Sequence, residues 1–300
     1  MNHTIADWIK RNSLAAYFSL AILLSWSIYI PLVFVRQGWT QADLPYSIHY
    51  FASFGPMLAS IVMTRLTGGR VGLRELWSRI TRWRVAWPYA AFALLSPVVL
   101  FLLAAVAMRL VQGEWPDLRL LGQANYLPYL GWAVLPIWII TFGFGEEIGW
   151  RGFALPRLQA KFGVSKATLI LALLWFLWHV PSFFYHETYI GMGWILVPGM
   201  LVGVLFGAVL FTWLYNGSGG SILMVAIWHG LFDLLTASAA GRDFIPIVTS
   251  VGVIAWGLFV ANTHRRWGFR SARYAYVAVA SGNHCSVSRR VTRPWKEDST

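Results

Sequence analysis

Charged side chains that suit hydrolytic chemistry first appear in the segment 145–152, which reads GEEIGWRG. On a helix of about 3.6 residues per turn, Glu147 and Arg151 share one face and can form an ion pair, whereas Glu146 points about 100° away. The two glutamates are therefore given different roles. Glu147 and Arg151 form a structural pair that supports the site, and Glu146, without a local cation, is the candidate general base. The alternative is a charged helix end at the membrane interface.

Two histidine elements follow along the chain. His179 lies in the aromatic segment 175–181, WFLWHVP, where Pro181 loosens the helical turn. His229 and Asp233 are four residues apart and share a helix face. That spacing suits ligation of one metal ion, or a histidine oriented by a carboxylate. The structural alternatives are a hydrogen-bonded packing histidine for the first element and a pair that joins two helices for the second.

These groups stand out because an ionisable side chain in the middle of a bilayer costs at least about 2.5 kcal/mol. Of the 12 acidic residues, only Glu146, Glu147 and Asp233 lie within or at the ends of apolar segments. His186 and Glu187 do not continue into the H-E-x-x-H zinc pattern, since Ile190 stands in place of the second histidine. That pair is predicted to belong to an outer loop.

The elements that carry these residues are predicted to be transmembrane helices. The chain has 300 residues, 57% hydrophobic and only 12% charged, against about 25% charged in an ordinary soluble domain. Apolar runs of about 20 residues recur, as a bilayer requires. We therefore expect an all-α polytopic transmembrane helical bundle of about eight spans, listed as 15–35, 46–64, 86–108, 126–148, 167–185, 194–214, 221–239 and 244–263.

The predicted organisation has three parts. Residues 1–14 form a cytoplasmic N-terminal segment, residues 15–263 the transmembrane bundle, with a peptidase core at 126–240, and residues 264–300 a basic, mobile cytoplasmic tail. The apolar run after Lys10 and Arg11 reads as a retained span rather than a cleaved signal peptide. Cys285 is the only cysteine, so a monomer has no disulfide.

Positive charge predicts the orientation. The loop from Arg65 to Arg84 holds six arginines against Glu75, and the fourth-to-fifth connection is also basic, whereas the alternate loops are poor in Lys and Arg. With eight spans, both termini should be cytoplasmic. The net charge of +12 is explained by these segments, which would meet anionic lipid headgroups, and nucleic-acid binding is not expected. Trp77 and Trp83 suggest that the arginine-rich loop is amphipathic and lies along the headgroups.

Together, E-E-x-x-x-R, an aromatic-x-x-x-His element and His-x-x-x-Asp on consecutive predicted helices resemble the CAAX protease and bacteriocin-processing (CPBP) family of intramembrane peptidases. The resemblance covers about residues 126–240, and the chain is most similar in outline to the bacterial members. Two positions depart from the family pattern. Trp175 replaces the more usual Phe, which is expected to be harmless, and Asp233 often corresponds to Asn.

The resemblance implies an endopeptidase that acts near the cytoplasmic membrane face, with Glu146 and His179 activating water. It assigns His229 and Asp233 either to metal coordination or to stabilising the oxyanion. An ionised Asp233 cannot donate to an oxyanion, which favours a role as metal ligand or partner of His229. The family has been described both as metal-dependent and as glutamate-based. Glu146, His179 and His229 are therefore candidate ligands of a divalent metal such as zinc, and the cofactor stays unassigned.

The substrate implied is a membrane-associated peptide or protein, and the expected location is a bacterial inner membrane. The sequence sets neither cleavage specificity nor oligomeric state. Two other functions remain open. One is a non-catalytic membrane immunity or partner-binding protein that keeps the same helices. The other is a proton-coupled transporter that uses the carboxylates and histidines as a relay, although no inverted repeat is evident.

Overall fold

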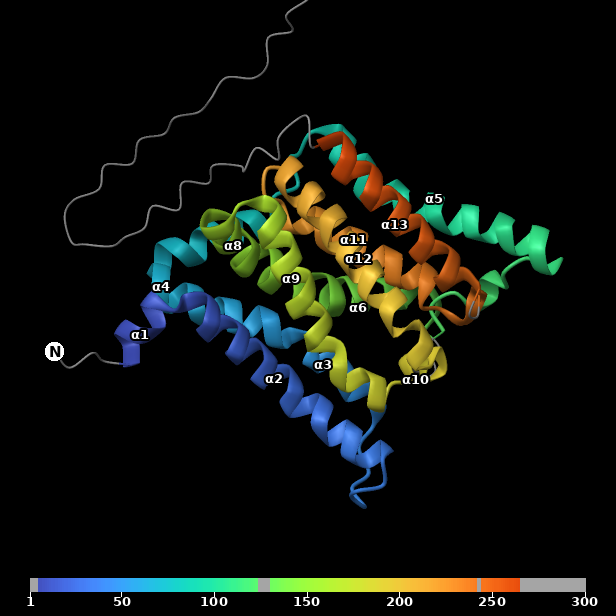
Figure 1. The fold of residues 1–300 in the computed structure, drawn as a ribbon, viewed down its shortest axis with the longest axis horizontal. Coiled ribbons are helices and arrows are strands. Elements are labelled where there is room, and N and C mark those ends of the chain that lie inside the picture. Colours follow the sequence, from blue (N-terminus) through green and yellow to red (C-terminus); the bar gives the residue numbers. More distant parts are fainter. Residues whose placement is uncertain (1–4, 124–129, 242–243, 265–300) are drawn as a thin grey trace, which may run out of the picture.

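The computed structural model describes residues 5–123, 130–241 and 244–264 (Figure 1). Within these ranges the regular elements are all helices, and no strand occurs. The predicted all-α polytopic bundle is confirmed. The predicted tail lies outside the described residues except for His264, the last residue of α13. Three short elements are α1 (Ile5–Arg11), η2 (Leu118–Leu120) and η8 (Ala239–Gly241).

Five of the eight predicted spans are helices long and apolar enough to cross a membrane. They have few charges because a bilayer offers no partners to ionised side chains or unpaired backbone groups. The five are α2 (Ser13–Arg36), α5 (Trp87–Gln112), α9 (Val164–His179) continued by η6 (Val180–Phe184), η7 (Trp194–Leu196) continued by α11 (Val197–Gly217), and α13 (Phe244–His264).

The other three predicted spans are largely helical in their described residues but do not meet that criterion. The second is divided into η1 (Tyr46–Ile48), α3 (His49–Ala52) and α4 (Phe54–Ile80). The fourth comprises η3 (Gly131–Ala133), α6 (Val134–Trp138) and the π-helix η4 (Ile139–Glu146). The seventh is α12 (Ile222–Thr236), whose 15 residues cover about 22 Å, less than the roughly 30 Å of a hydrocarbon core.

Helix α4 carries most of the arginine-rich segment that was predicted to be an amphipathic loop, and Arg82 and Arg84 follow its end. The helix changes direction at Gly69, whose φ of 58° is accessible to glycine at little cost. Beyond the kink it presents Trp77 to the surface and Leu76 to the core. The arginines of this segment were predicted to lie at the membrane interface, but Arg79 is buried in the protein and only 3% exposed. It donates to the Gly152 carbonyl and the Tyr215 hydroxyl, both at 2.9 Å.

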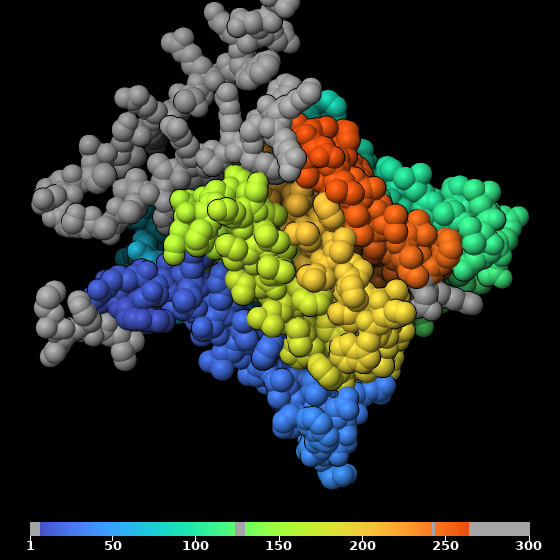
Figure 2. Space-filling model, viewed as in Figure 1, coloured from blue at the N-terminus to red at the C-terminus, as the bar shows by residue number. Residues whose placement is uncertain are grey.

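The helices form one bundle around α12. This short helix packs against α5, α6 and η4, and α11 packs against both α9 and α13. On the face in Figure 2, α9, α11 and α13 lie side by side and cover α12. Among the described residues, the largest cluster of buried apolar side chains runs from α2 to α13, and two smaller clusters lie around Phe101 and Trp138. In this central helix, α12, the His229 side chain is 10% exposed and that of Asp233 is 24% exposed.

The ribbon also groups the segments predicted to share one membrane side. The end of α4, helix α1 and helix α8 (Leu155–Phe162) lie along the left of Figure 1. The end of α2 and helix α10 (Glu187–Met192) lie toward the lower right of the view. This grouping is compatible with the predicted orientation, and the cytoplasmic assignment of the termini stays a prediction.

Candidate active site

The first motif lies where α-helical and π-helical turns alternate. The π-helix η4 ends at Glu146, α7 (Glu147–Gly149) follows, and a second π-helix, η5 (Trp150–Ala154), leads into α8. Wide turns of this kind are rare and occur frequently at functional sites. Here they place a glutamate pair and an arginine on one helical run in the core of the bundle.

Glycines let this run approach its neighbours closely. A Cβ at Gly145 would lie 2.8 Å from the carbonyl oxygen of Ser53, and one at Gly149 would lie 2.5 Å from the Cβ of Pro56. Contacts of that length are not tolerated, so larger residues would push α4 away. The small-xxx-small pattern of Gly145 and Gly149 therefore brings the site against the start of α4.

Glu147 and Arg151 form the predicted ion pair. Arg151 Nη1 lies 2.8 Å from Glu147 Oε1, and both side chains are fully buried. The guanidinium also lies against two neighbouring aromatic rings, 4.6 Å from the centroid of Trp175 and 4.5 Å from that of Phe211. Cation–π contact offsets part of the cost of burying the charge.

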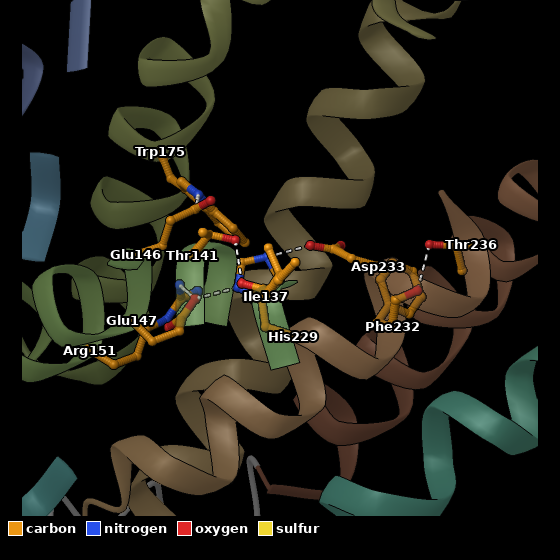
Figure 3. A network of polar contacts seen from close by, with 10 residues as sticks. All are labelled: Ile137, Thr141, Glu146, Glu147, Arg151, Trp175, His229, Phe232, Asp233 and Thr236. Atoms are coloured by element: carbon orange, nitrogen blue, oxygen red, sulfur yellow. Dashed lines mark hydrogen bonds and ion pairs between the residues drawn. The ribbon is translucent and has the colours of Figure 1, made fainter. Parts of the chain in front are cut away.

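Glu147 has a second partner that the spacing of the first motif does not reveal. His229 Nδ1 donates to the same carboxylate oxygen, Oε1, at 3.0 Å (Figure 3). On the opposite side of the ring, His229 Nε2 lies 3.8 Å from Asp233 Oδ2, an ion-pair distance rather than a hydrogen bond. The predicted pairing of His229 with Asp233 is present, and the histidine lies between two carboxylates.

Glu146 points away from this pair, as helical phase predicted. Its side chain accepts a hydrogen bond at Oε2 from the Trp175 indole nitrogen at 2.8 Å, and it is 3% exposed. Trp175 also contacts His229, with the rings edge to face and their centroids 5.8 Å apart. Trp175 of the second motif therefore contacts both the first and the third motif, and sequence reasoning missed these contacts.

His179 joins the site through a hydrogen bond to the main chain of Trp175. Its Nδ1 lies 2.8 Å from the carbonyl oxygen of Trp175. Because a carbonyl only accepts, Nδ1 must carry the proton, and in the neutral ring Nε2 keeps its lone pair. His179 lies outside the side-chain network drawn in Figure 3, and in this tautomer its Nε2 can accept a hydrogen bond.

The candidate metal ligands are not gathered into a coordination set. Within residues 5–123, 130–241 and 244–264, no three His, Cys, Asp or Glu side chains come together so as to hold a metal ion. Glu146 and His229 make the hydrogen bonds described above with Trp175 and Glu147, respectively. The donor set Glu146, His179 and His229 therefore does not fit a zinc centre in this arrangement.

A second group of buried polar side chains, the tyrosine–histidine cluster, consists of His49, Tyr185 and His186. His49 Nδ1 and the Tyr185 hydroxyl are 2.5 Å apart, and the rings of His49 and His186 have centroids 5.0 Å apart. His186 was predicted to lie in an outer loop. It does precede α10, but its side chain is only 7% exposed and is part of the core.

The fold and the site together define a class: a helical membrane protein with a buried centre of carboxylates, histidines and an arginine. Residues 127–235 match the family model of type II CAAX prenyl endopeptidases, Rce1-like. CAAX prenyl protease 2 of Methanococcus maripaludis is 29% identical over 123 residues, which are 38% of this chain and 41% of that protein. The resemblance to the CPBP family is confirmed over the region that holds all three motifs, while less than half of each chain is matched.

Proposed function

We propose that this chain is an intramembrane endopeptidase that hydrolyses peptide bonds through water activated by Glu146 and His179. The observation that carries the proposal is the separation of the two glutamates. Glu147 is committed to Arg151 and His229, whereas Glu146 has one carboxylate oxygen held by an indole N–H. Its other oxygen is left for a water molecule. The match of residues 127–235 to a peptidase family model supports the same reaction class.

In the proposed mechanism, Glu146 takes one proton from water as the water oxygen attacks the scissile carbonyl carbon. Nε2 of His179 accepts a hydrogen bond from the same water and fixes its direction. The tetrahedral intermediate then collapses, the carbon–nitrogen bond breaks, and Glu146 returns its proton to the leaving amine. The products are a carboxylic acid and an amine, and the acid then loses its remaining water-derived proton to the amine or to solvent. No Ser or Cys nucleophile is needed.

His229 is proposed to stabilise the oxyanion. Held by Glu147 at Nδ1, a protonated His229 presents its Nε2–H as a donor to developing negative charge. Asp233 lies on the Nε2 side of the ring at 3.8 Å, where its negative charge favours the protonated histidine. An ionised Asp233 acts in this scheme through His229 and does not itself contact the oxyanion.

The metal-free, glutamate-type scheme is proposed over the metalloprotease because, among the described residues, the candidate ligands are not gathered into a group that could hold a metal ion. A chelator titration of peptidase activity, with metal analysis of the purified protein, tests this choice. Activity that is lost with chelator and restored by zinc would replace the glutamate-type scheme with a metal-dependent one.

The proposed substrate is a membrane-associated peptide or protein, cleaved near the cytoplasmic face of an inner membrane. The related archaeal protein carries the name of a CAAX prenyl protease, which suggests a bond close to a membrane-anchored end. The grouping of α1, the end of α4 and α8 on one side supports the orientation with cytoplasmic termini. Contact of the exposed arginines with anionic lipid headgroups is part of the same proposal.

The test uses purified full-length protein in liposomes with a library of membrane-tethered peptides, and mass spectrometry of the products. Wild type should cleave, and Glu146→Gln should lower the rate about a thousandfold. The matched control is Glu75→Gln, because the Glu75 side chain is half exposed and pairs with Arg79 outside the site. Equal rates for wild type and Glu146→Gln would overturn the proposal.

The two competing functions predict different results. A proton-coupled transporter would give ion-dependent flux into proteoliposomes without new peptide termini. A non-catalytic partner-binding protein would keep its cellular function in Glu146→Gln. Proteomic comparison of membranes that hold wild type or Glu146→Gln would identify substrates that accumulate in the variant.

A further inference from the structure

Trp175 contacts both groups that are proposed to activate water. Its indole Nε1 donates to Glu146 Oε2 at 2.8 Å, and its main-chain carbonyl accepts from His179 Nδ1 at 2.8 Å. The two contacts use different parts of one residue. A side-chain substitution can therefore remove the first contact and leave the second in place.

The indole hydrogen bond has a specific effect on Glu146. It is the hydrogen bond that the structure gives this carboxylate within the described residues, and a donor to a charged acceptor is stronger than a neutral pair. By occupying Oε2 it fixes the rotation of the carboxylate and leaves Oε1 for water. A phenylalanine ring at position 175 would fill a similar space but has no donor.

The indole ring is itself held from the other side. The Arg151 guanidinium lies 4.6 Å from the centroid of the Trp175 ring, and Arg151 is tied to Glu147. Trp175 is 7% exposed, so its ring has little room to move. The structural ion pair is thereby connected to Glu146 through one aromatic side chain rather than through a direct charge contact.

We propose that Trp175 is a positioning residue that fixes the Glu146 carboxylate through its indole N–H and the His179 ring through its main-chain carbonyl. The inference rests on the proposed peptidase function and deepens it. It also corrects the expectation that Trp in place of Phe is harmless at this position. In this chain the indole is part of the arrangement that holds the base.

The test is Trp175→Phe, which keeps an aromatic ring under Arg151 and removes the donor. Turnover, kcat, should fall about tenfold, the order expected when one hydrogen bond to a charged group is lost, while KM changes less than twofold. The acid limb of the pH–rate profile should move to higher pH, because the ionised carboxylate has lost a donor.

The matched control is Trp138→Phe. The Trp138 indole is also buried and donates at the same distance, 2.8 Å, but to the neutral Tyr50 hydroxyl. This variant also loses one indole hydrogen bond and the same ring volume. Its thermal stability therefore measures the loss of stability that any buried Trp→Phe change of this kind causes. We expect it to keep wild-type kcat and the wild-type pH profile.

A second measurement does not depend on peptidase activity. Dicyclohexylcarbodiimide labels protonated carboxyl groups in apolar surroundings, and mass spectrometry quantifies its adduct on Glu146. Trp175→Phe should increase labelling at neutral pH, and Trp138→Phe should not. Wild-type kcat and labelling in Trp175→Phe, or a loss of activity that only follows a loss of folded protein, would overturn the positioning role. If wild type cleaves no peptide, the proposed function fails, and the labelling result alone decides the role of Trp175.

Discussion

Two buried histidines in this protein have very different partners. His229 lies between the carboxylates of Glu147 and Asp233, at 3.0 and 3.8 Å. His49, in the tyrosine–histidine cluster, pairs with the Tyr185 hydroxyl and packs against the rings of Tyr29 and His186. The two residues are equally buried, at 8% exposure. Burial therefore does not distinguish a reactive histidine from a packing one.

The charge of the partners makes the difference. A carboxylate at each ring nitrogen favours the imidazolium, which can donate to an oxyanion. A tyrosine hydroxyl and stacked rings suit a neutral imidazole, whose contribution is packing and one hydrogen bond. We therefore propose a chemical role for the His229 site and a structural role for the tyrosine–histidine cluster, and the following predictions test that division.

The largest expected effect is on stability, from Glu147→Ala. The substitution leaves both Arg151 and His229 without the carboxylate oxygen that they share. Removing one partner of a buried pair costs about 3–5 kcal/mol. Thermal unfolding in detergent and the amount of protein in the membrane measure the loss. Glu146→Gln should keep nearly wild-type stability, and equal losses in the two variants would refute the separate roles of the glutamates.

The next effect is on catalysis, from His229→Phe compared with His49→Phe. Loss of the proposed oxyanion donor should lower kcat by about 100- to 1,000-fold. His49→Phe removes an imidazole ring from the tyrosine–histidine cluster. In the folded fraction of this variant, kcat should change less than about twofold. Rates are normalised to folded protein, measured by size-exclusion chromatography. A comparable loss in both variants would remove the distinction between the two sites.

A smaller effect is expected for Asp233→Asn, which introduces the residue often found at this position in the CPBP family. Because Asp233 Oδ2 lies 3.8 Å from His229 Nε2, beyond hydrogen-bond length, the variant should keep activity within about tenfold of wild type. Initial rates on the cleaved peptide measure this. Complete inactivity would show that the carboxylate itself is required, as a metal ligand or a proton carrier.

The smallest effect is expected from Tyr185→Phe in the tyrosine–histidine cluster. The variant removes one hydrogen bond to His49 and should cost about 1 kcal/mol of stability. Peptidase activity should be unchanged. A drop in kcat similar to that of His229→Phe would mean that this cluster takes part in the reaction.

Features within one helix were largely predictable from the sequence. The Glu147–Arg151 pair and the shared face of His229 and Asp233 follow from a spacing of four residues. Membrane helices follow from apolar composition, although three of the eight predicted spans are short or interrupted. The length of α12 was predicted less well. The apolar run continues beyond Thr236, but the helix ends there.

Contacts between helices were not predictable, because helical phase gives the direction of a side chain but not which neighbour it meets. The Trp175–Glu146 and His229–Glu147 hydrogen bonds join residues 29 and 82 positions apart. The contact of Arg79 with the Gly152 carbonyl is also of this kind. Crossing angles and close approaches at Gly145 and Gly149 decide such pairs.

The sequence by itself determined that this is a helical membrane protein, through its apolar composition, and it supplied the candidate reactive groups, which are the carboxylates, histidines and arginine of three motifs. Only the tertiary structure decided which of these side chains contact one another. Glu147 serves Arg151 and His229 together, and Trp175 holds Glu146 and carries the carbonyl that orients His179. The physical reason is that covalent spacing fixes neighbours along one helix, whereas packing against other helices selects the partners that make a site.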